Sequence, residues 1–585
     1  MIIQRLLQMI RSFFYLAFLM IWILCIPGAV SAQQVQDTEG SLLPDINPQD
    51  IEIRSQYQAR FPGLRRQPIL GFNPRPRVYQ VDPNRAPYLE SYEEIIAQLP
   101  VGEISRPAPP EYLSPLFPDP KHGYGHLGAG SYLTPESGIY ANTEIGENHW
   151  LTGNLDYRSS AGHRDEPATS FRFLNLETGY RGKLDPSTVL GMTLSANSDF
   201  NRMLELSPSV IDRMDDTARK EYRGLNLDTR ITRFKNKIES WNVGIGGMYQ
   251  AMDLDAGNVT PLTSDIEEWG ITLDANKNWI GERLHEQYGF QTDVQTGGYQ
   301  SSGLSDSQFW HMAGAGGRYE QLFDYKTKVD ASLMVYHMSD AVDQTFYVSP
   351  DLNVEFYLMD EVTFTGSVSG KPEHPRHISY HRENRFLTPD NLLRHSYHLK
   401  GSAGISVEFY PGNKLSGGIS YQDSKNYPYY SRRDLSSVFS GGDSGYYQIQ
   451  YGRASVFKIH GGYSADLIPG QLWVNLNAWW QDPKLTEEDI KVPFEENLGL
   501  HGAVTVRPVQ QVLFEAWGDF TGTRTAPGIS DMNPFIHIGS RVEVRVSEKV
   551  GIYGKILNLL NQSYEIWEGY PERPFQVYGG VSLIF

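Results

Sequence analysis

Apolar and polar residues alternate one by one in many short segments from His122 onward, and this period of two is typical of β-strands. Residues 151–157 place leucine and tyrosine side chains on one face and threonine, asparagine and aspartate on the other. Residues 225–232 and 269–276 follow the same rule. Each segment therefore predicts a strand with one apolar and one polar face.

The connections between the expected strands are of two kinds. Long polar links include residues 197–221, 371–396, 425–445 and 483–494. Tight turns rich in Gly, Pro, Asn and Asp join nine hairpins. These turns lie near Asp185-Pro186-Ser187, Asn236-Lys237, Gly281-Glu282, Phe323-Asp324, Asp360-Glu361, Pro411-Gly412-Asn413, Pro469-Gly470, Pro508-Val509 and Glu548-Lys549. Soluble sandwiches and propellers also alternate, but short turns at one rim and long loops at the other are typical of transmembrane barrels.

The segments predict about 22 strands over residues 122–585. They begin with residues 124–133, 138–146 and 150–159, continue through nine hairpins and end on a single strand. The expected fold class is all-β, a transmembrane antiparallel up-and-down β-barrel preceded by a Pro-rich, mostly irregular N-terminal segment. An even strand number places both ends of the barrel at one rim, which faces the periplasm in bacterial outer membranes.

Residues 1–32 predict a signal peptide. Arg5 and Arg11 supply a basic start, residues 13–26 form an apolar run, and Val30-Ser31-Ala32 precedes the expected cleavage site. A retained membrane helix needs roughly 20 apolar residues, and this run is shorter. The mature chain is therefore expected to begin at Gln33.

Charge and cysteine content exclude several classes of site. The single cysteine, Cys25, leaves with the signal peptide, and bulky Leu24 before it does not suit lipid attachment. Disulfides, thiolate metal sites and a cysteine nucleophile are thereby excluded. Loss of Arg5 and Arg11 changes the formal charge from −18 to −20. A chain this acidic repels the phosphates of nucleic acids, so we expect no nucleic-acid partner.

Residues 33–121 form a proline-rich leader, with 15 of the chain's 35 prolines in 89 residues. Proline lacks the N–H that helices and sheet ladders need, so we expect an irregular segment with at most a short helix at residues 91–99 and a strand at 50–56. Two roles stay open. The leader either threads into the barrel or tethers a periplasmic partner.

Two groups of side chains are candidates for ligand chemistry. His374, His377 and His381 lie close together in one long link, and imidazoles with nearby carboxylates bind transition metals or metal chelates. The alternative is an ordinary solvated loop. A second link carries ligand-binding loop candidates that stack on sugars or pair with anionic chelates, unless they pack against other loops. They are Tyr427, Tyr429, Tyr430, Arg432 and Arg433.

Motifs for enzymatic chemistry are missing from the sequence. It contains no phosphate-binding glycine loop, dinucleotide fingerprint or helical metal pair. Gly442-Asp443-Ser444-Gly445 is similar to the nucleophile motif of trypsin-like proteases, but nothing else in the chain supports that fold. We expect no enzyme activity and no cofactor.

The C-terminal stretch, residues 551–585, resembles the end of TonB-dependent receptors through Asn558-Leu559-Leu560-Asn561, Tyr564-Glu565 and Gly569-Tyr570-Pro571. Its last strand resembles the assembly signal that the outer-membrane barrel insertion machinery recognises. The apolar face of that strand carries Phe575, Val577, Val581, Leu583 and Phe585. The resemblance implies an integral outer-membrane protein, in contact with outer-membrane lipids, that imports scarce solutes with energy from TonB.

One departure from the family bears on function. The family's plug is a folded domain longer than this leader, and the mature N-terminus shows no convincing TonB box. We therefore expect solute binding or passage across the outer membrane, with TonB as an open partner. The alternative is a barrel without transport activity that anchors an envelope complex through its leader.

Overall fold

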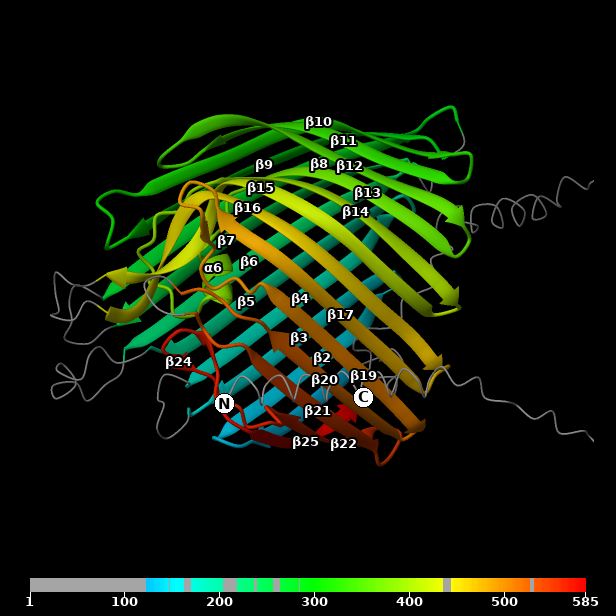
Figure 1. The fold of residues 1–585 in the computed structure, drawn as a ribbon. Helices are drawn as coiled ribbons and strands as arrows, with labels where there is room; N and C mark the ends of the chain where they lie inside the picture. The colour runs from blue at the N-terminus through cyan, green and yellow to red at the C-terminus, as the bar shows by residue number, and fades with distance from the viewer. Residues whose placement is uncertain are drawn as a thin grey trace, which may run out of the picture. The chain divides into compact units, whose positions relative to one another are not determined.

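The structure is a computed structural model, and one closed antiparallel sheet dominates it (Figure 1). It describes residues 123–146, 148–162, 170–203, 218–235, 239–255, 263–283, 285–434, 443–526 and 531–585. The predicted signal peptide and leader, with the helix and strand expected inside the leader, lie outside these residues. So does the turn expected at Asn236-Lys237.

The sheet alternates long strands with turns and loops, as the period-two pattern predicts. The elements are β1 (Gly123–Gly130), β2 (Thr134–Gly146), β3 (His149–Ser160), β4 (Phe171–Asp185), β5 (Thr188–Arg202), β6 (Arg219–Phe234), β7 (Ser240–Asp255), β8 (Ser264–Ile280), β9 (Gln287–Ser301), β10 (Gln308–Phe323), β11 (Thr327–Ser339), β12 (Gln344–Met359), β13 (Val362–Glu373), α6 (His377–Glu383), β14 (Ser396–Tyr410), β15 (Asn413–Asp434), β16 (Asp443–Ile468), β17 (Leu472–Leu485), β18 (Ile490–Lys491), β19 (Leu498–Val509), β20 (Val512–Thr521), β21 (Phe535–Arg545), β22 (Val550–Leu557), β23 (Glu565–Trp567), β24 (Tyr570–Pro571) and β25 (Gln576–Ile584).

Pairing of the first and last strands closes the ring. β1 is antiparallel to β25, with Leu127 opposite Val581, and β25 pairs on its other side with β22. The two-residue strand β18 and the separate β23–β24 pair belong to loops. The remaining 22 strands form the barrel, which confirms the predicted fold class.

The apolar face of each strand is the exposed one. In β8, Trp269, Ile271 and Leu273 are 41%, 47% and 44% exposed, whereas Glu268 is 1% exposed. A soluble barrel buries apolar side chains inside and exposes polar ones. The reverse arrangement, with an apolar outer band and a polar lumen, is typical of barrels surrounded by lipid.

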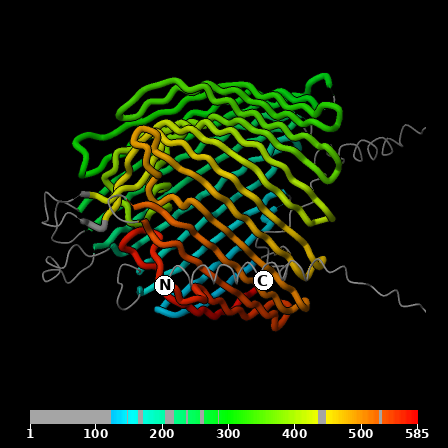
Figure 2. Tube along the Cα trace, viewed as in Figure 1, coloured from blue at the N-terminus to red at the C-terminus, as the bar shows by residue number. Residues whose placement is uncertain are grey.

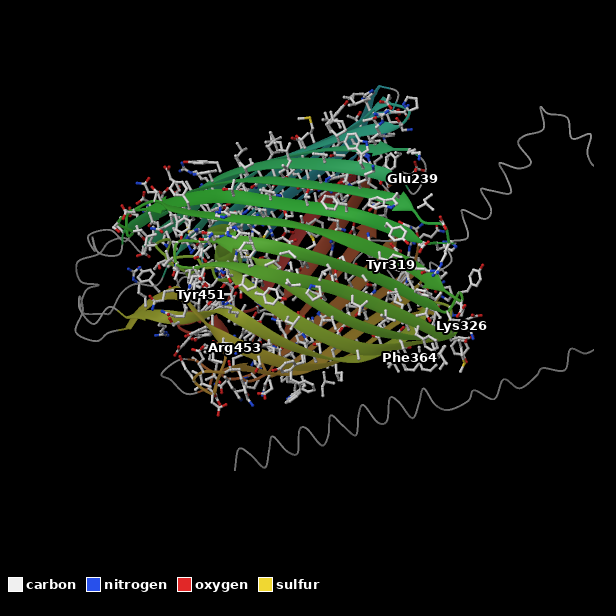
Figure 3. The ribbon with its side chains drawn as sticks, turned by 90° about the horizontal axis from the view of Figure 1, so that it is seen from above. Glu239, Tyr319, Lys326, Phe364, Tyr451 and Arg453 are labelled. Atoms are coloured by element: carbon white, nitrogen blue, oxygen red, sulfur yellow. The ribbon has the colours of Figure 1, made fainter. Side chains whose placement is uncertain are left out.

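The two rims differ as the sequence predicts (Figure 2). Short turns join β4 to β5, β10 to β11 and β12 to β13, among others, at one rim, and the longer connections lie at the opposite rim. Figure 3 shows Glu239 and Lys326 at the short-turn end and Tyr451 and Arg453 toward the other. Because β1 begins and β25 ends at the short-turn rim, both ends of the barrel lie there.

Two expected long links are shorter than predicted. Residues 197–202 and 219–221 continue β5 and β6 as paired strand. Most of the expected link 425–445 is strand as well, because β15 and β16 pair well beyond neighbouring strands. Polar and aromatic side chains marked these segments as loops, but strands that extend beyond the lipid need no apolar outer face. Among the described residues, no helix is long and apolar enough to span a membrane.

Candidate functional site

The connection between β13 and β14 folds back into the barrel, and we call its residues 374–395 the strap. Its two ends are adjacent, because Glu373 and Ser396 are paired in the β13–β14 ladder. The strap contains α6, which lies near the long-loop rim (Figure 1). The helix ends at Asn384, which is extended and donates its backbone N–H to Tyr380 O. This short helix was not predicted, since seven residues carry too little periodicity.

Three histidines of the strap pack singly against the barrel wall. His374 stacks on Trp310 of β10 with ring centroids 4.3 Å apart, and His381 stacks on Tyr222 of β6 at 5.5 Å. His377 meets Tyr299 of β9 edge-on at 4.8 Å. All three imidazoles are buried, at 8% exposure or less. Burial disfavours the charged imidazolium, and it lowers the pKa of His374 to about 4.

Buried charges of the wall hold the first half of the strap. Glu268 of β8 accepts a hydrogen bond from the backbone N–H of His377 at 3.1 Å and lies 3.1 Å from its Nδ1. Lys220 of β6, fully buried, donates from Nζ to the carbonyl oxygens of Arg385 (3.2 Å) and Leu387. A buried charge is costly unless it is paired or hydrogen-bonded, so these contacts restrict the strap to one position.

The second half of the strap is held by the β11–β12 connection and by β9 of the barrel wall. Asp340, between β11 and β12, accepts from the backbone N–H of His395 at 2.7 Å and lies 2.6 Å from its Nδ1. Burial of Asp340 opposes its charged form, but these bonds and the N–H groups of Asp343 and Val342 outweigh burial and lower the pKa of Asp340. Tyr299 also accepts from the N–H of Leu393, at 2.9 Å.

The strap also contacts the opposite wall. Thr388 donates its N–H to the carbonyl oxygen of Tyr447 in β16 at 2.9 Å, and the side chain of Asn391 accepts from the N–H of Ile449 at 2.8 Å. β16 follows β6 by ten strands in a closed ring of 22, so the two contact walls are almost opposite one another. The strap therefore crosses the lumen.

The link between β22 and β25 also packs against the strap. Phe386 stacks on Tyr570 with ring centroids 3.4 Å apart, and Arg385 lies 3.5 Å from Glu572. Tyr447 donates its hydroxyl to the carbonyl oxygen of Glu568 at 2.9 Å. These contacts join strap, link and β16 into one hydrophobic cluster at the long-loop rim.

The predicted ligand-binding loop candidates all lie in β15, and most are engaged within the protein. Tyr427 donates to Glu495 at 2.8 Å, Arg432 lies 3.2 Å from Glu568, and Arg433 lies 2.6 Å from Asp390. Tyr430 is buried in the hydrophobic cluster, and Tyr429 packs beside Leu485 and Val492. Their role in ligand contact stays a prediction.

The predicted metal candidates are near one another in sequence but face different partners. Among the described residues, no group of three or more His, Cys, Asp and Glu side chains has the arrangement of a metal site. Packing of each imidazole against a different strand gives a structural reason for their presence. Metal binding by His374, His377 and His381 has no geometric support in the described residues.

A cavity of about 700 Å³ lies between the strap and the β4–β9 wall. On β6, Tyr222 contacts the strap, while Asn226 and Asp228 of the same strand line the cavity further toward the short turns. The cavity therefore lies on the side of the strap that faces the short-turn rim. Polar side chains dominate its lining, and they include Asn175, Glu177, Ser195, Thr272, Gln295, Arg376, Ser379 and Arg382.

A second cavity, of about 480 Å³, shares Asn175 and Arg382 with the first. It adds Arg158, Asp199 and the indole of Trp567. Arg382, on α6, thus faces both cavities. Within the described part of the chain, Arg376 and Arg382 form no ion pair within 4.0 Å, unlike the arginines of β15. Guanidinium groups in a polar cavity can bind carboxylate, phosphate or catecholate oxygens, and Arg382 has an electrostatic interaction with the carboxylate of Asp199.

Sequence reasoning did not find these lumen residues. Asn175, Asp228 and Thr272 occupy polar positions of alternating strands, and they differ in no visible way from other lumen positions. Arg382 lies beside the histidines that drew attention to the strap. In the sequence, only the unusual length of the 371–396 link indicated that chain from this region could fold into the lumen.

Solved structures of similar fold are outer-membrane receptors and transporters. The FrpB iron transporter from Neisseria meningitidis aligns with a TM-score of 0.63 and 9% identity over 79% of this chain and 81% of that one. The copper transporter OprC aligns with a TM-score of 0.63 and 12% identity over 79% of this chain and 80% of that one. The ferric-catecholate import receptor Fiu from E. coli K12 aligns with a TM-score of 0.61 and 10% identity over 80% of this chain and 82% of that one.

The likeness is one of fold, because these identities are too low to carry more. The sequence matches no family model and no curated protein. The alignments cover 79–80% of this chain, so the shared fold includes most of the closed barrel. In fold, the described residues from 123 to 585 are a closed antiparallel β-barrel similar to those of these receptors and transporters.

Proposed function

We propose that this protein binds a hydrophilic solute inside its barrel and passes it across the outer membrane. The short-turn rim and both termini face the periplasm, and the strap lies toward the cell exterior. TonB is the proposed energy source, since the related folds belong to receptors and transporters of scarce metals and chelates. The insertion machinery would recognise β25 through the outward face that ends at Phe585.

The polar cavity under the strap carries this proposal. It combines Arg376 and Arg382, which form no ion pair within 4.0 Å among the described residues, with amides, hydroxyls and carboxylates from five strands. A barrel that only anchors other proteins has no need for unpaired charges around an internal space. The solute would enter the cavity from the cell exterior when the strap moves away from Glu268 and Lys220.

Quenching of tryptophan fluorescence tests the proposal, because Trp567 lines the second cavity, which shares Arg382 with the first, and ferric chelates quench indole emission. The probes are ferric citrate and a ferric tris-catecholate, titrated into the purified full chain. We expect saturable quenching that weakens about tenfold in Arg382→Gln, since a hydrogen bond to a charged group contributes about 1.5–3 kcal/mol. Arg223→Gln, on the barrel exterior, is the matched control. Equal affinity in Arg382→Gln and wild type would contradict binding in this cavity.

A second function stays open, because the strap is held by many buried contacts. In this alternative the barrel never opens, and the leader, residues 33–121, recruits a periplasmic complex. Uptake and single-channel conductance separate the two, measured on the whole protein and on a chain without residues 33–121. The anchor function would be favoured if neither the whole protein nor the shortened chain shows uptake or conductance and the leader captures a periplasmic partner.

A further inference from the structure

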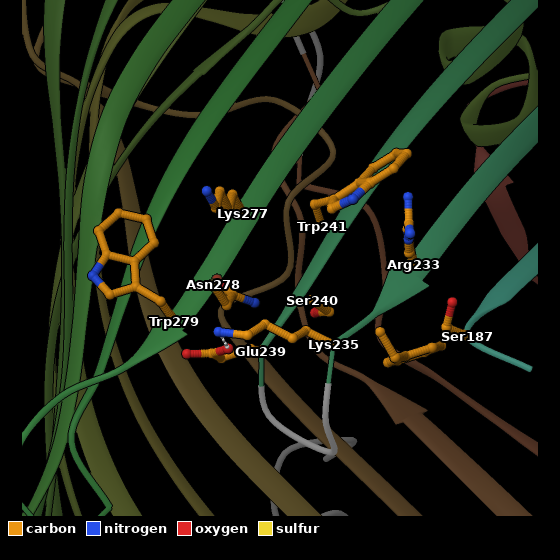
Figure 4. Close-up of a pocket in the computed structure, with 10 residues that line it drawn as sticks. Ser187, Arg233, Lys235, Glu239, Ser240, Trp241, Lys277, Asn278 and Trp279 are labelled. Atoms are coloured by element: carbon orange, nitrogen blue, oxygen red, sulfur yellow. Dashed lines mark ion pairs between the residues drawn. The ribbon is translucent and has the colours of Figure 1, made fainter.

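Two cations flank a tryptophan on the outer surface of β6, β7 and β8. The sheet register places Arg233 opposite Trp241 and Trp241 opposite Lys277, so the three side chains form one row across adjacent strands. Figure 4 shows this row with Trp279 and Lys235 nearby. The residues line a cavity of about 620 Å³.

The row points away from the lumen. Trp241 lies on the same face of β7 as Val243 and Ile245, because the three are spaced two residues apart. Val243 and Ile245 are 38% and 56% exposed on the outer face. Lys277 likewise follows Ile271 and Leu273 at two-residue intervals. The cavity is therefore on the lipid-facing side, where no solute of the lumen reaches it.

Its height on the barrel matches the edge of the hydrocarbon layer. Ile245 and Leu273 belong to the apolar outer band, and the turns of the short-turn rim follow directly beyond Arg233 and Trp279. Tryptophan is enriched at this depth because its ring is apolar and its N–H is polar. Trp241 and Trp279 are 39% and 38% exposed here. In a bilayer that covers the apolar outer band, headgroup phosphates would lie at this level.

The charge of the site is positive in a chain of net charge −18. Arg233, Lys235 and Lys277 bring three cations and Glu239 one carboxylate, which leaves a local charge of +2. Glu239 pairs with Lys235 at 2.7 Å. Among the described residues, Arg233 and Lys277 form no ion pair within 4.0 Å, and their only carboxylate neighbours with an electrostatic interaction there are Asp185 for Arg233 and Glu239 for Lys277.

We propose that the Arg233–Trp241–Lys277 row binds the headgroup phosphate of an anionic phospholipid in the leaflet beside the short-turn rim. The phosphate lies between the two cations, and the acyl chains follow the apolar band past Ile245 and Leu273. This proposal rests on the membrane placement in the proposed function and is independent of the solute. A zwitterionic headgroup would add a cation beside Arg233 and Lys277, which favours the anionic class.

Native mass spectrometry of the full chain tests the proposal, with phosphatidylglycerol and phosphatidylethanolamine as probes in mixed micelles. We expect preferential retention of phosphatidylglycerol. A basic residue near an anionic membrane surface contributes about 1 kcal/mol, so Arg233→Gln and Lys277→Gln should each weaken retention about fivefold. Lys326→Gln, on another turn of the same rim, is the control and should retain the preference.

The outcomes are distinguishable. Unchanged preference in the Arg233→Gln/Lys277→Gln double variant would overturn the site, as would equal retention of the two lipids by wild type. Trp241→Ala should reduce retention of both lipids. A barrel that retains no phospholipid of either class would overturn the membrane placement itself, whereas failure of chelate binding alone would leave the lipid site intact.

Discussion

Single side chains decide how the strap is held. His374 and His381 are buried as neutral imidazoles, and each fills the space beside one aromatic ring of the wall. Burial lowers the pKa of His381 well below its usual range, and the nearby Lys220 charge adds to this effect. Burial also lowers the pKa of His374, and the negative charges of Glu268 and Asp340 raise it by less than burial lowers it.

Acid should therefore loosen the strap. A released His374 has the ordinary pKa of about 6.5 and takes up a proton below that pH, whereas the packed imidazole stays neutral to about pH 4. The contribution of His374 to the stability of the packed strap should be constant above pH 6.5 and fall between pH 6.5 and 4. Hydrogen exchange of residues 374–395 at pH 7.5, 5.5 and 4.5 measures this.

The matched variant for this prediction is His374→Phe, which keeps an aromatic ring against Trp310 and removes the titrating group. Its exchange should depend less on pH than that of wild type. If both proteins show the same pH dependence, His374 is not the group responsible.

At the scale of elements, the seam between β1 and β25 completes the ring. Close approach of backbones is needed there: a Cβ at Gly580 would lie 2.5 Å from the carbonyl oxygen of Leu127 on the facing strand. The neighbouring Gly579 points to the other face, where the nearest atom is 3.9 Å away. Val577, Val581 and Leu583 keep the outer side of β25 apolar, as the sequence predicts.

Gly580→Ala should weaken the seam, while Gly579→Ala should not. Overpacking of a close contact costs about 1–3 kcal/mol, so we expect the Gly580→Ala barrel to unfold at a lower temperature. The shift between folded and unfolded mobility on gels after graded heating reports the unfolding. Equal unfolding temperatures in the two variants would argue against a close-packed seam.

For the whole molecule, the strap is a self-contained insertion in a hairpin. Its ends meet at the Glu373–Ser396 pair, so a tight turn can replace residues 374–395 without disturbing β13 or β14. A 22-stranded ring encloses a wide lumen, and proteins of this size fill it with additional chain. Here the strap and the β22–β25 link fill the long-loop end.

Replacement of the strap by Asn-Gly should open the barrel at this end. We expect low conductance from wild type in planar bilayers and a large, steady conductance when both the strap and residues 33–121 are removed. Each single deletion shows how much that segment contributes. A double deletion that folds, by gel mobility, and still does not conduct would contradict passage through the lumen.

The barrel could be predicted from the amino-acid sequence, because alternation, turn chemistry and the apolar last strand are local patterns, and the residues of each strand specify its inner and outer face. The sequence therefore predicted the strand number, both rims and the outward face of β25. The closure of the long-loop end was decided only by tertiary structure. The strap is held by Lys220, Glu268, Asp340 and Tyr447, which are far apart in the chain and meet only because the ring closes. For the same reason, histidines that the sequence placed together as metal candidates each pack against a different strand.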